Sequence, residues 1–135
     1  MTGIEPELWA ARPREAIAFY QAAFGASELL LVGEGDDIVA RLAVGEARFW
    51  VSAASPDRPA PSGDHPATGR TLLVVDDPDA VHEAALTAGA MSLAPVADEH
   101  GWRLGRIVDV AGHEWEIGRP AQADRGGTAS DRSGS

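Results

Sequence analysis

Apolar residues recur at helical spacing in two stretches of the chain. Ile17, Tyr20 and Phe24 form the first stripe, which predicts a helix with Pro13 in its first turn. The second helix is predicted to begin after Asp77, whose side chain can cap it. Each stretch ends at a glycine followed by an alanine. Glycine adopts without strain the left-handed conformation that ends many helices. These two stops are Gly25–Ala26 and Gly89–Ala90.

Short runs with strand-like patterning surround both predicted helices. One run precedes each helix and three runs follow it. The runs of the first set are Glu5–Ala10, Ser27–Val32, Ile38–Val44 and Ala47–Ser52, and those of the second are Arg70–Val75, Met91–Val96, Arg103–Val110 and Glu114–Ile117. The same βαβββ order of elements therefore occurs twice.

The two sets also match residue by residue. Phe49 corresponds to Trp115 and Val51 to Ile117, both at an offset of 66 residues, while the helices match at an offset of 64. We therefore predict a single α+β domain over residues 1–120, built as tandem βαβββ modules over about residues 5–54 and 69–118.

Two segments lack any periodic pattern. Ser55–Gly69 holds four prolines and two glycines, which predicts a linker or a mobile loop. Residues 121–135 are mostly Gly, Ser, Ala and Asp, which predicts a disordered tail.

Composition limits the possible binding partners and the expected location of the protein. The chain has no cysteine, which excludes disulfides and thiolate metal sites and favours a cytoplasmic location. Its net charge of −10 should repel phosphate backbones, so we expect no nucleic-acid partner. No apolar stretch is long enough to span a membrane, and residues 1–6 lack the features of an export signal.

Several motifs carry a resemblance to a known family. They are Ala16-Ile17-Ala18-Phe19-Tyr20, Phe24-Gly25-Ala26, Gly101-Trp102-Arg103-x-Gly105 and Gly112-His113-x-Trp115-Glu116-Ile117. Over roughly Glu5 to Gly118 the chain resembles the vicinal oxygen chelate superfamily of glyoxalase, bleomycin-resistance and dioxygenase proteins, and within it the PhnB-like subgroup. The resemblance implies a cup-shaped mixed sheet around a ligand cavity, and a homodimer whose cavities often take residues from both chains.

The same resemblance locates a possible metal site. Metal-dependent members use His, Glu or Gln from four strands, and these four places fall here on Glu5, Trp50, Arg70 and Glu116. Glu5 and Glu116 can bind a metal, but an indole cannot, and arginine stays protonated. We therefore expect no metal and no other cofactor. If a metal were bound, Glu5 and Glu116 would hold it.

A ligand site is expected on the same faces of the strands. Side-chain alternation places Glu7 and Trp9 on the face of Glu5. A wall of tryptophan, arginine and carboxylates suits a planar or aromatic small molecule. The predicted ligand-binding residues are Glu7, Trp9, Trp50, Arg70, Trp102 and Glu116. Other interpretations stay open: Arg70 and Glu116 as a structural ion pair, Trp9 and Trp50 as core residues, and Trp102 as a dimer contact.

These features favour a metal-independent protein that binds and sequesters a small organic molecule, such as an antibiotic. The alternative is a lyase, isomerase or cyclase with Glu7 or Glu116 as general base. A third hypothesis is a metal enzyme whose ligands lie one residue away from the inferred places. The remaining histidines give no ligand pattern; His65, His82 and His100 are expected at the surface and His113 in a turn.

Overall fold

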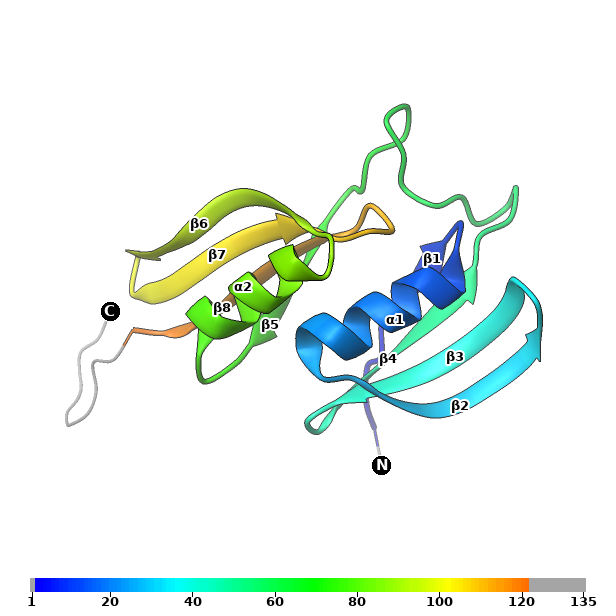
Figure 1. Cartoon of the computed structure of the whole chain (residues 1–135), viewed down its shortest axis with the longest axis horizontal. Coiled ribbons are helices and arrows are strands. Elements are labelled where there is room, and N and C mark those ends of the chain that lie inside the picture. The colour runs from blue at the N-terminus through cyan, green and yellow to red at the C-terminus, as the bar shows by residue number, and fades with distance from the viewer. Residues whose placement is uncertain (1, 122–135) are drawn as a thin grey trace.

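The computed structural model describes residues 2–121 and contains the predicted order of elements twice (Figure 1). The first module consists of β1 (Glu7–Ala10), α1 (Pro13–Phe24), β2 (Ser27–Glu34), β3 (Asp37–Val44) and β4 (Ala47–Ala53). The second consists of β5 (Arg70–Val74), α2 (Pro78–Thr87), β6 (Met91–Glu99), β7 (Trp102–Val108) and β8 (Glu114–Pro120). The α+β fold class is confirmed. The predicted tail lies, beyond Ala121, outside the described residues.

Each module forms its own four-stranded mixed sheet. The strand orders are β1-β4-β3-β2 and β5-β8-β7-β6, with the first pair parallel and the other pairs antiparallel in both. Glu7 lies opposite Trp50 in the first sheet, and Leu72 lies opposite Glu116 in the second. Because these pairs hold corresponding positions, the duplication extends to the register of the strands. No strand pairing joins the two sheets within residues 2–121.

Both helices begin and end as their sequences predict. Pro13 and Pro78 stand in the first turns, and the Asp77 carboxylate accepts a hydrogen bond from the backbone N–H of Ala80 at 3.1 Å. Gly25 ends α1 with φ of 71°, a conformation that costs other residues more. No helix of the described residues is long and apolar enough to cross a membrane.

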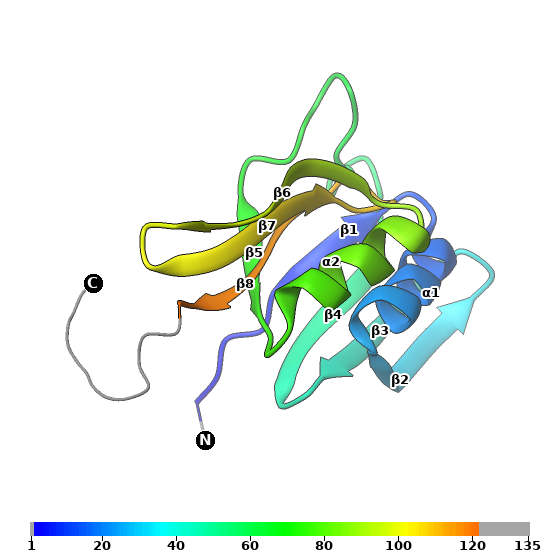
Figure 2. The same ribbon diagram turned by 60° about the vertical axis from the view of Figure 1, so that its left-hand side comes forward.

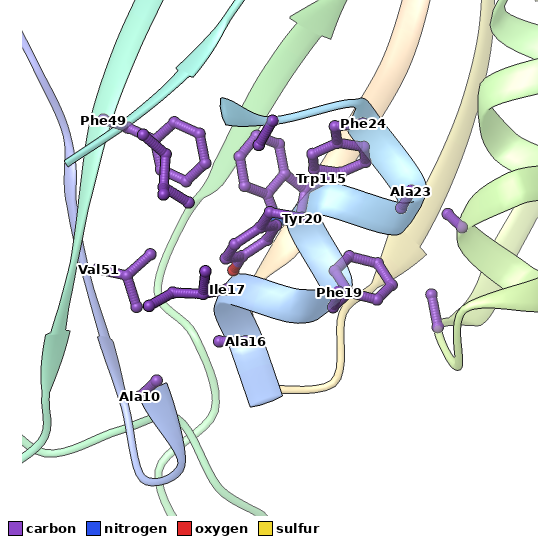
Figure 3. Close-up of a cluster of buried hydrophobic side chains, with 14 of the residues drawn as sticks. Ala10, Ala16, Ile17, Phe19, Tyr20, Ala23, Phe24, Phe49, Val51 and Trp115 are labelled. Carbon is purple, nitrogen blue, oxygen red and sulfur yellow. The ribbon is translucent and has the colours of Figure 1, made fainter. Parts of the chain in front are cut away.

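One apolar core lies between the two sheets and encloses the packed helices (Figures 1 and 2). Figure 3 shows Tyr20 and Phe24 of α1 beside Phe49 and Trp115. Phe49 belongs to the first sheet and Trp115 to the second, yet their ring centroids lie 5.8 Å apart. The helix-covered faces of the sheets therefore share this core. We call the opposite face of each sheet its open face.

A buried carboxylate ties the modules together. Asp109 is 5% exposed, and its Oδ2 accepts hydrogen bonds from the Tyr20 hydroxyl of α1 and, at 2.8 Å, from Trp115 Nε1. Its Oδ1 accepts from the backbone N–H groups of Ala111 and His113. Burial, reinforced by the charge of Asp109, raises the pKa of Tyr20 well above its ordinary value.

Two sequence predictions need correction. The strand predicted to reach Val110 ends at Val108, because the Asp109 side chain bonds the backbone of the next turn instead. His82 is buried, at 8% exposure, rather than at the surface. Its ring packs beside Gly105, where a Cβ atom would lie 2.9 Å from His82 Cδ2, so the missing side chain makes room for it.

Candidate functional site

The predicted ligand residues lie mainly on the open faces. In the first sheet, Glu7 pairs with Trp50 and Trp9 with Ser52, so all four side chains share the face opposite to buried Phe49. In the second sheet, Arg70, Glu114 and Glu116 share the corresponding face, because Arg70 pairs with Glu114 and Leu72 with Glu116.

The open face of the first sheet holds a cluster around Glu5. Arg41 of β3 grips this carboxylate with two hydrogen bonds, Nη2 to Oε2 at 2.6 Å and Nε to Oε1 at 3.0 Å. Trp50 Nε1 donates to the same carboxylate at 2.9 Å, and the Arg41 guanidinium lies 5.7 Å from the Trp50 ring centroid. Hydrogen bonds from Arg41, helped by Trp50, hold the pKa of Glu5 below its ordinary value.

The open face of the second sheet holds a cluster around Glu116. Arg70 Nη1 and Arg106 Nε approach Glu116 Oε2 at 3.4 Å and 3.2 Å. Arg70 also lies 3.6 Å from Glu114, and Arg106 Nη2 donates to Glu99 at 3.0 Å. This bond to Glu99, together with the contact with Glu116, raises the pKa of Arg106. The ion pair between Arg70 and Glu116 that the sequence left open is present.

Arg41 and Arg106 were missed by the sequence reasoning. Arg41 pairs with Trp50 in the first sheet and Arg106 with Glu116 in the second, so the two arginines occupy corresponding places. A signal was available, since the two residues lie 65 positions apart, between the two offsets that relate the modules. Arg41 is also the single charge in the apolar run of residues 38–44.

These contacts bear on the four inferred metal places. Both carboxylates, Glu5 and Glu116, already accept hydrogen bonds from arginine. A divalent cation would meet one guanidinium group and an indole N–H at Glu5, and two guanidinium groups at Glu116. Neither is a donor set that binds metals. Within residues 2–121 no three His, Cys, Asp or Glu side chains gather as a metal site would require. The residues at the four inferred places therefore do not fit a metal.

A cavity of about 460 Å³, the open-side cavity, brings three of the predicted residues together. Glu7, Trp9 and Arg70 line it, along with residues 59–61 and 65–69 of the inter-module loop. Trp50 and Glu116 lie on the open faces outside its lining, and Trp102 stands opposite Pro120 at the other end of the second sheet.

Local contacts fix the walls of the open-side cavity. Glu7 Oε2 accepts a hydrogen bond from Ser52 Oγ at 2.7 Å. His113 belongs to the turn between β7 and β8, and its Nε2 lies 2.8 Å from the backbone oxygen of Trp9. The buried Trp9 Nε1 has no hydrogen-bond partner among residues 2–121, which is unusual for a buried donor.

Comparisons with known proteins agree with this architecture. The model of the Glyoxalase/Bleomycin resistance protein/Dioxygenase superfamily matches residues 5–117. An uncharacterised protein of Mycobacterium bovis is 32% identical over 128 residues, covering 88% of this chain and 84% of the relative. An uncharacterised protein of Mycobacterium tuberculosis strain H37Rv is equally similar, with 75% of its length covered.

Solved structures show the same fold. TioX from Micromonospora sp. ML1 superposes with a TM-score of 0.70 at 26% identity, covering 88% of this chain and 99% of that one. The fosfomycin resistance protein FosX of Listeria monocytogenes superposes with a TM-score of 0.71 at 13% identity, covering 90% and 95%.

Proposed function

The chain belongs to the Glyoxalase/Bleomycin resistance protein/Dioxygenase superfamily, and we propose that within it this protein binds a small organic molecule without a metal. The proposal rests on the arginines that contact the two carboxylates at the inferred metal places. Arg41 donates hydrogen bonds to the Glu5 carboxylate, and Arg70 and Arg106 donate to that of Glu116. Their charges serve the binding of anionic or hydrogen-bond-accepting groups better than the binding of a cation.

The open-side cavity supports a planar or aromatic ligand. Its volume of about 460 Å³ falls in the range of small-molecule sites. Trp9 offers an apolar surface, Arg70 a charged donor, and Glu7 an acceptor, which together favour an aromatic compound with polar substituents. Sequestration of an antibiotic of this kind is the function we propose, by a member of the PhnB-like subgroup acting in the cytoplasm.

A homodimer completes this proposal. Both open faces carry exposed apolar side chains, among them Val32 at 56%, Leu72 at 42% and Val74 at 56% exposure. Apolar side chains gathered on a sheet face favour burial against a partner. If a second copy packed against the open faces, one sheet from each chain would together form a cup. Light scattering should therefore give twice the chain mass, and a monomer mass at micromolar concentration would contradict this part.

A catalytic role is the second candidate, and one contact favours Glu7 for it. Glu7 lines the open-side cavity, accepts a hydrogen bond from the Ser52 hydroxyl and lies 4.0 Å from the Arg58 guanidinium. Glu116 accepts hydrogen bonds from two arginines, so its oxygens are less free to contact a ligand. Glu7 is thus the better general base for a lyase, isomerase or cyclase.

Native mass spectrometry of the purified protein tests the proposal. We expect an organic adduct that survives treatment with EDTA, and a weaker adduct in the Trp9→Ala variant. Recovery of a chemically altered product after incubation with the identified compound would favour the catalytic alternative. An adduct that appears only together with a stoichiometric transition metal would refute the proposal.

A further inference from the structure

A second cavity, the core-side cavity, lies across the seam between the modules from the open-side cavity. Leu8 of β1 and Thr71 of β5 border both cavities. The core-side cavity has a volume of about 390 Å³ and is lined by none of the six predicted ligand-binding residues. It is therefore a second cavity, although it shares Leu8 and Thr71 with the open-side cavity and Glu5 with the cluster on the first sheet.

The deep wall of the core-side cavity is aromatic and aliphatic. Phe24, Phe49 and Trp115 line it, and Figure 3 shows these three side chains grouped in the core. Trp115 lies edge to face with both phenylalanines, at centroid distances of 4.8 Å and 5.8 Å. Leu73 and Val44 continue the apolar wall. Such a surface accepts a further aromatic ring in the same edge-to-face manner.

The charged residues of the lining are Glu5, Glu46 and Arg48, and none of them belongs to the aromatic wall. Glu5 is already neutralised by Arg41, and exposed Glu46 is two residues from Arg48. Arg48 Nη1 donates to the backbone oxygens of Gly45 and Ala47, which holds it at the turn between β3 and β4. An ion entering the deep part would lose its hydration and meet no charged partner there, which is strongly unfavourable.

We propose that the core-side cavity binds a neutral, apolar aromatic compound at a second site between the modules. A hydrocarbon ring placed against the aromatic wall would remove apolar surface from water, which favours binding. The edge beside Gly3 and Ile4 precedes β1 and pairs with no strand, so entry there disturbs no sheet. The site joins residues from both modules, so an occupant would also brace the seam.

Calorimetric titration of the full-length protein with indole tests this site, with benzoate as a charged probe of similar size. We expect saturable indole binding and no measurable benzoate binding. Val44→Phe fills the cavity and should weaken indole binding about tenfold or more, which corresponds to 1.4 kcal/mol or more. Trp9→Ala, which alters only the open-side cavity, should leave indole affinity unchanged. Absence of saturable indole binding, or its loss in Trp9→Ala alone, would overturn the proposal.

A labelling experiment reads the site without filling it. The chain has no cysteine, so Leu73→Cys introduces a single thiol into the core-side wall. Indole should slow alkylation of Cys at this position several-fold, whereas a thiol introduced by Glu7→Cys in the open-side cavity should react at an unchanged rate. Equal rates with and without indole at position 73 would overturn the proposal. Neither result depends on the ligand of the open-side cavity.

Discussion

The two open faces place different chemistry on the same frame. Around Glu5, one arginine and one tryptophan satisfy a single carboxylate. Around Glu116, two arginines converge on one carboxylate. Arg41 and Arg106 nevertheless hold corresponding places in the register of the strands. The duplicated backbone therefore fixes where side chains stand, while each module has its own solution for balancing charge there.

The turns that precede the last strands differ more. In the first module, β3 and β4 are joined by Gly45 and Glu46 alone. In the second, β7 and β8 are joined by a longer turn organised by Asp109, whose carboxylate also reaches Tyr20 of the first module. The second module thus supplies the polar link that fastens the pair together, and the first has no counterpart.

Removing the Asp109 carboxylate should lower the folding stability more than any other change proposed below. Asp109→Ala leaves the Tyr20 hydroxyl, Trp115 Nε1 and two backbone N–H groups without their acceptor in a buried place. We expect chemical denaturation to show a loss of about 3–5 kcal/mol, the range for breaking a buried charged network. Asp98→Ala is the control, because Asp98 is an exposed carboxylate paired with Arg103, and it should change stability little. Similar losses in both variants would show that Asp109 stabilises the fold no more than an exposed carboxylate does.

Alkaline pH should weaken the same link. The pKa of Tyr20 is raised in the folded state, chiefly by burial. Below about pH 10 both states keep the proton, but above it the unfolded chain ionises first, so stability falls as pH rises toward the folded pKa. Denaturation midpoints measured from pH 8 to 11 should fall in the wild type and fall less steeply in Tyr20→Phe. Because Tyr20 is the single tyrosine, absorbance at alkaline pH reports its ionisation directly.

Tryptophan substitutions distinguish the binding side from the scaffold. Trp9→Ala should weaken binding of the co-purified ligand by about 1–3 kcal/mol through lost stacking and burial. Trp50→Ala should match that loss if the open faces meet in a dimer, since Trp50 lies outside the cavity of a single chain. Trp102→Phe is the control, because Trp102 does not line the cavity either and stands at the far end of its sheet. Fluorescence titration measures all three, and a normal affinity in Trp9→Ala would contradict the assigned site.

The matched arginines should give the smallest effects on stability. Arg41→Met removes two bonds to one carboxylate, whereas Arg106→Met removes bonds to both Glu99 and Glu116. Both clusters are partly solvated, so each loss should be slight, with the Arg106 variant the more affected. Thermal melts at low and high salt measure the difference. A larger effect at Arg41 would reverse the comparison.

Sequence patterns could predict the frame because helix and strand periodicities and glycine stops are local. Pro13, Asp77 and Gly25 mark helix ends without reference to the rest of the chain. The contacts of Asp109 could not be predicted in this way, because its partner Tyr20 is 89 residues distant. His82 was misplaced for a similar reason, since its burial depends on the missing side chain of Gly105 on a strand packed against α2.

The candidate site shows the same division. Strand alternation places Glu7, Trp9 and Trp50 on one face, as the register of β1 and β4 has them. Strand alternation does not tell which residues of one face lie close together. The sequence therefore could not predict that Trp102 lies away from the cavity. Arg41 was overlooked because its neighbours read as an apolar strand, although comparing the two modules would have exposed it.

Metal independence of ligand binding is the central claim, and affinity measured with and without a chelator tests it most directly. The identified ligand should be titrated against protein dialysed with EDTA and against the same protein supplied with manganese, zinc or nickel. With Trp50 and Arg70 at two of the inferred metal places and Arg41 bonded to Glu5, we predict the same affinity in every sample. Binding that disappears with EDTA and returns with one metal would contradict the account.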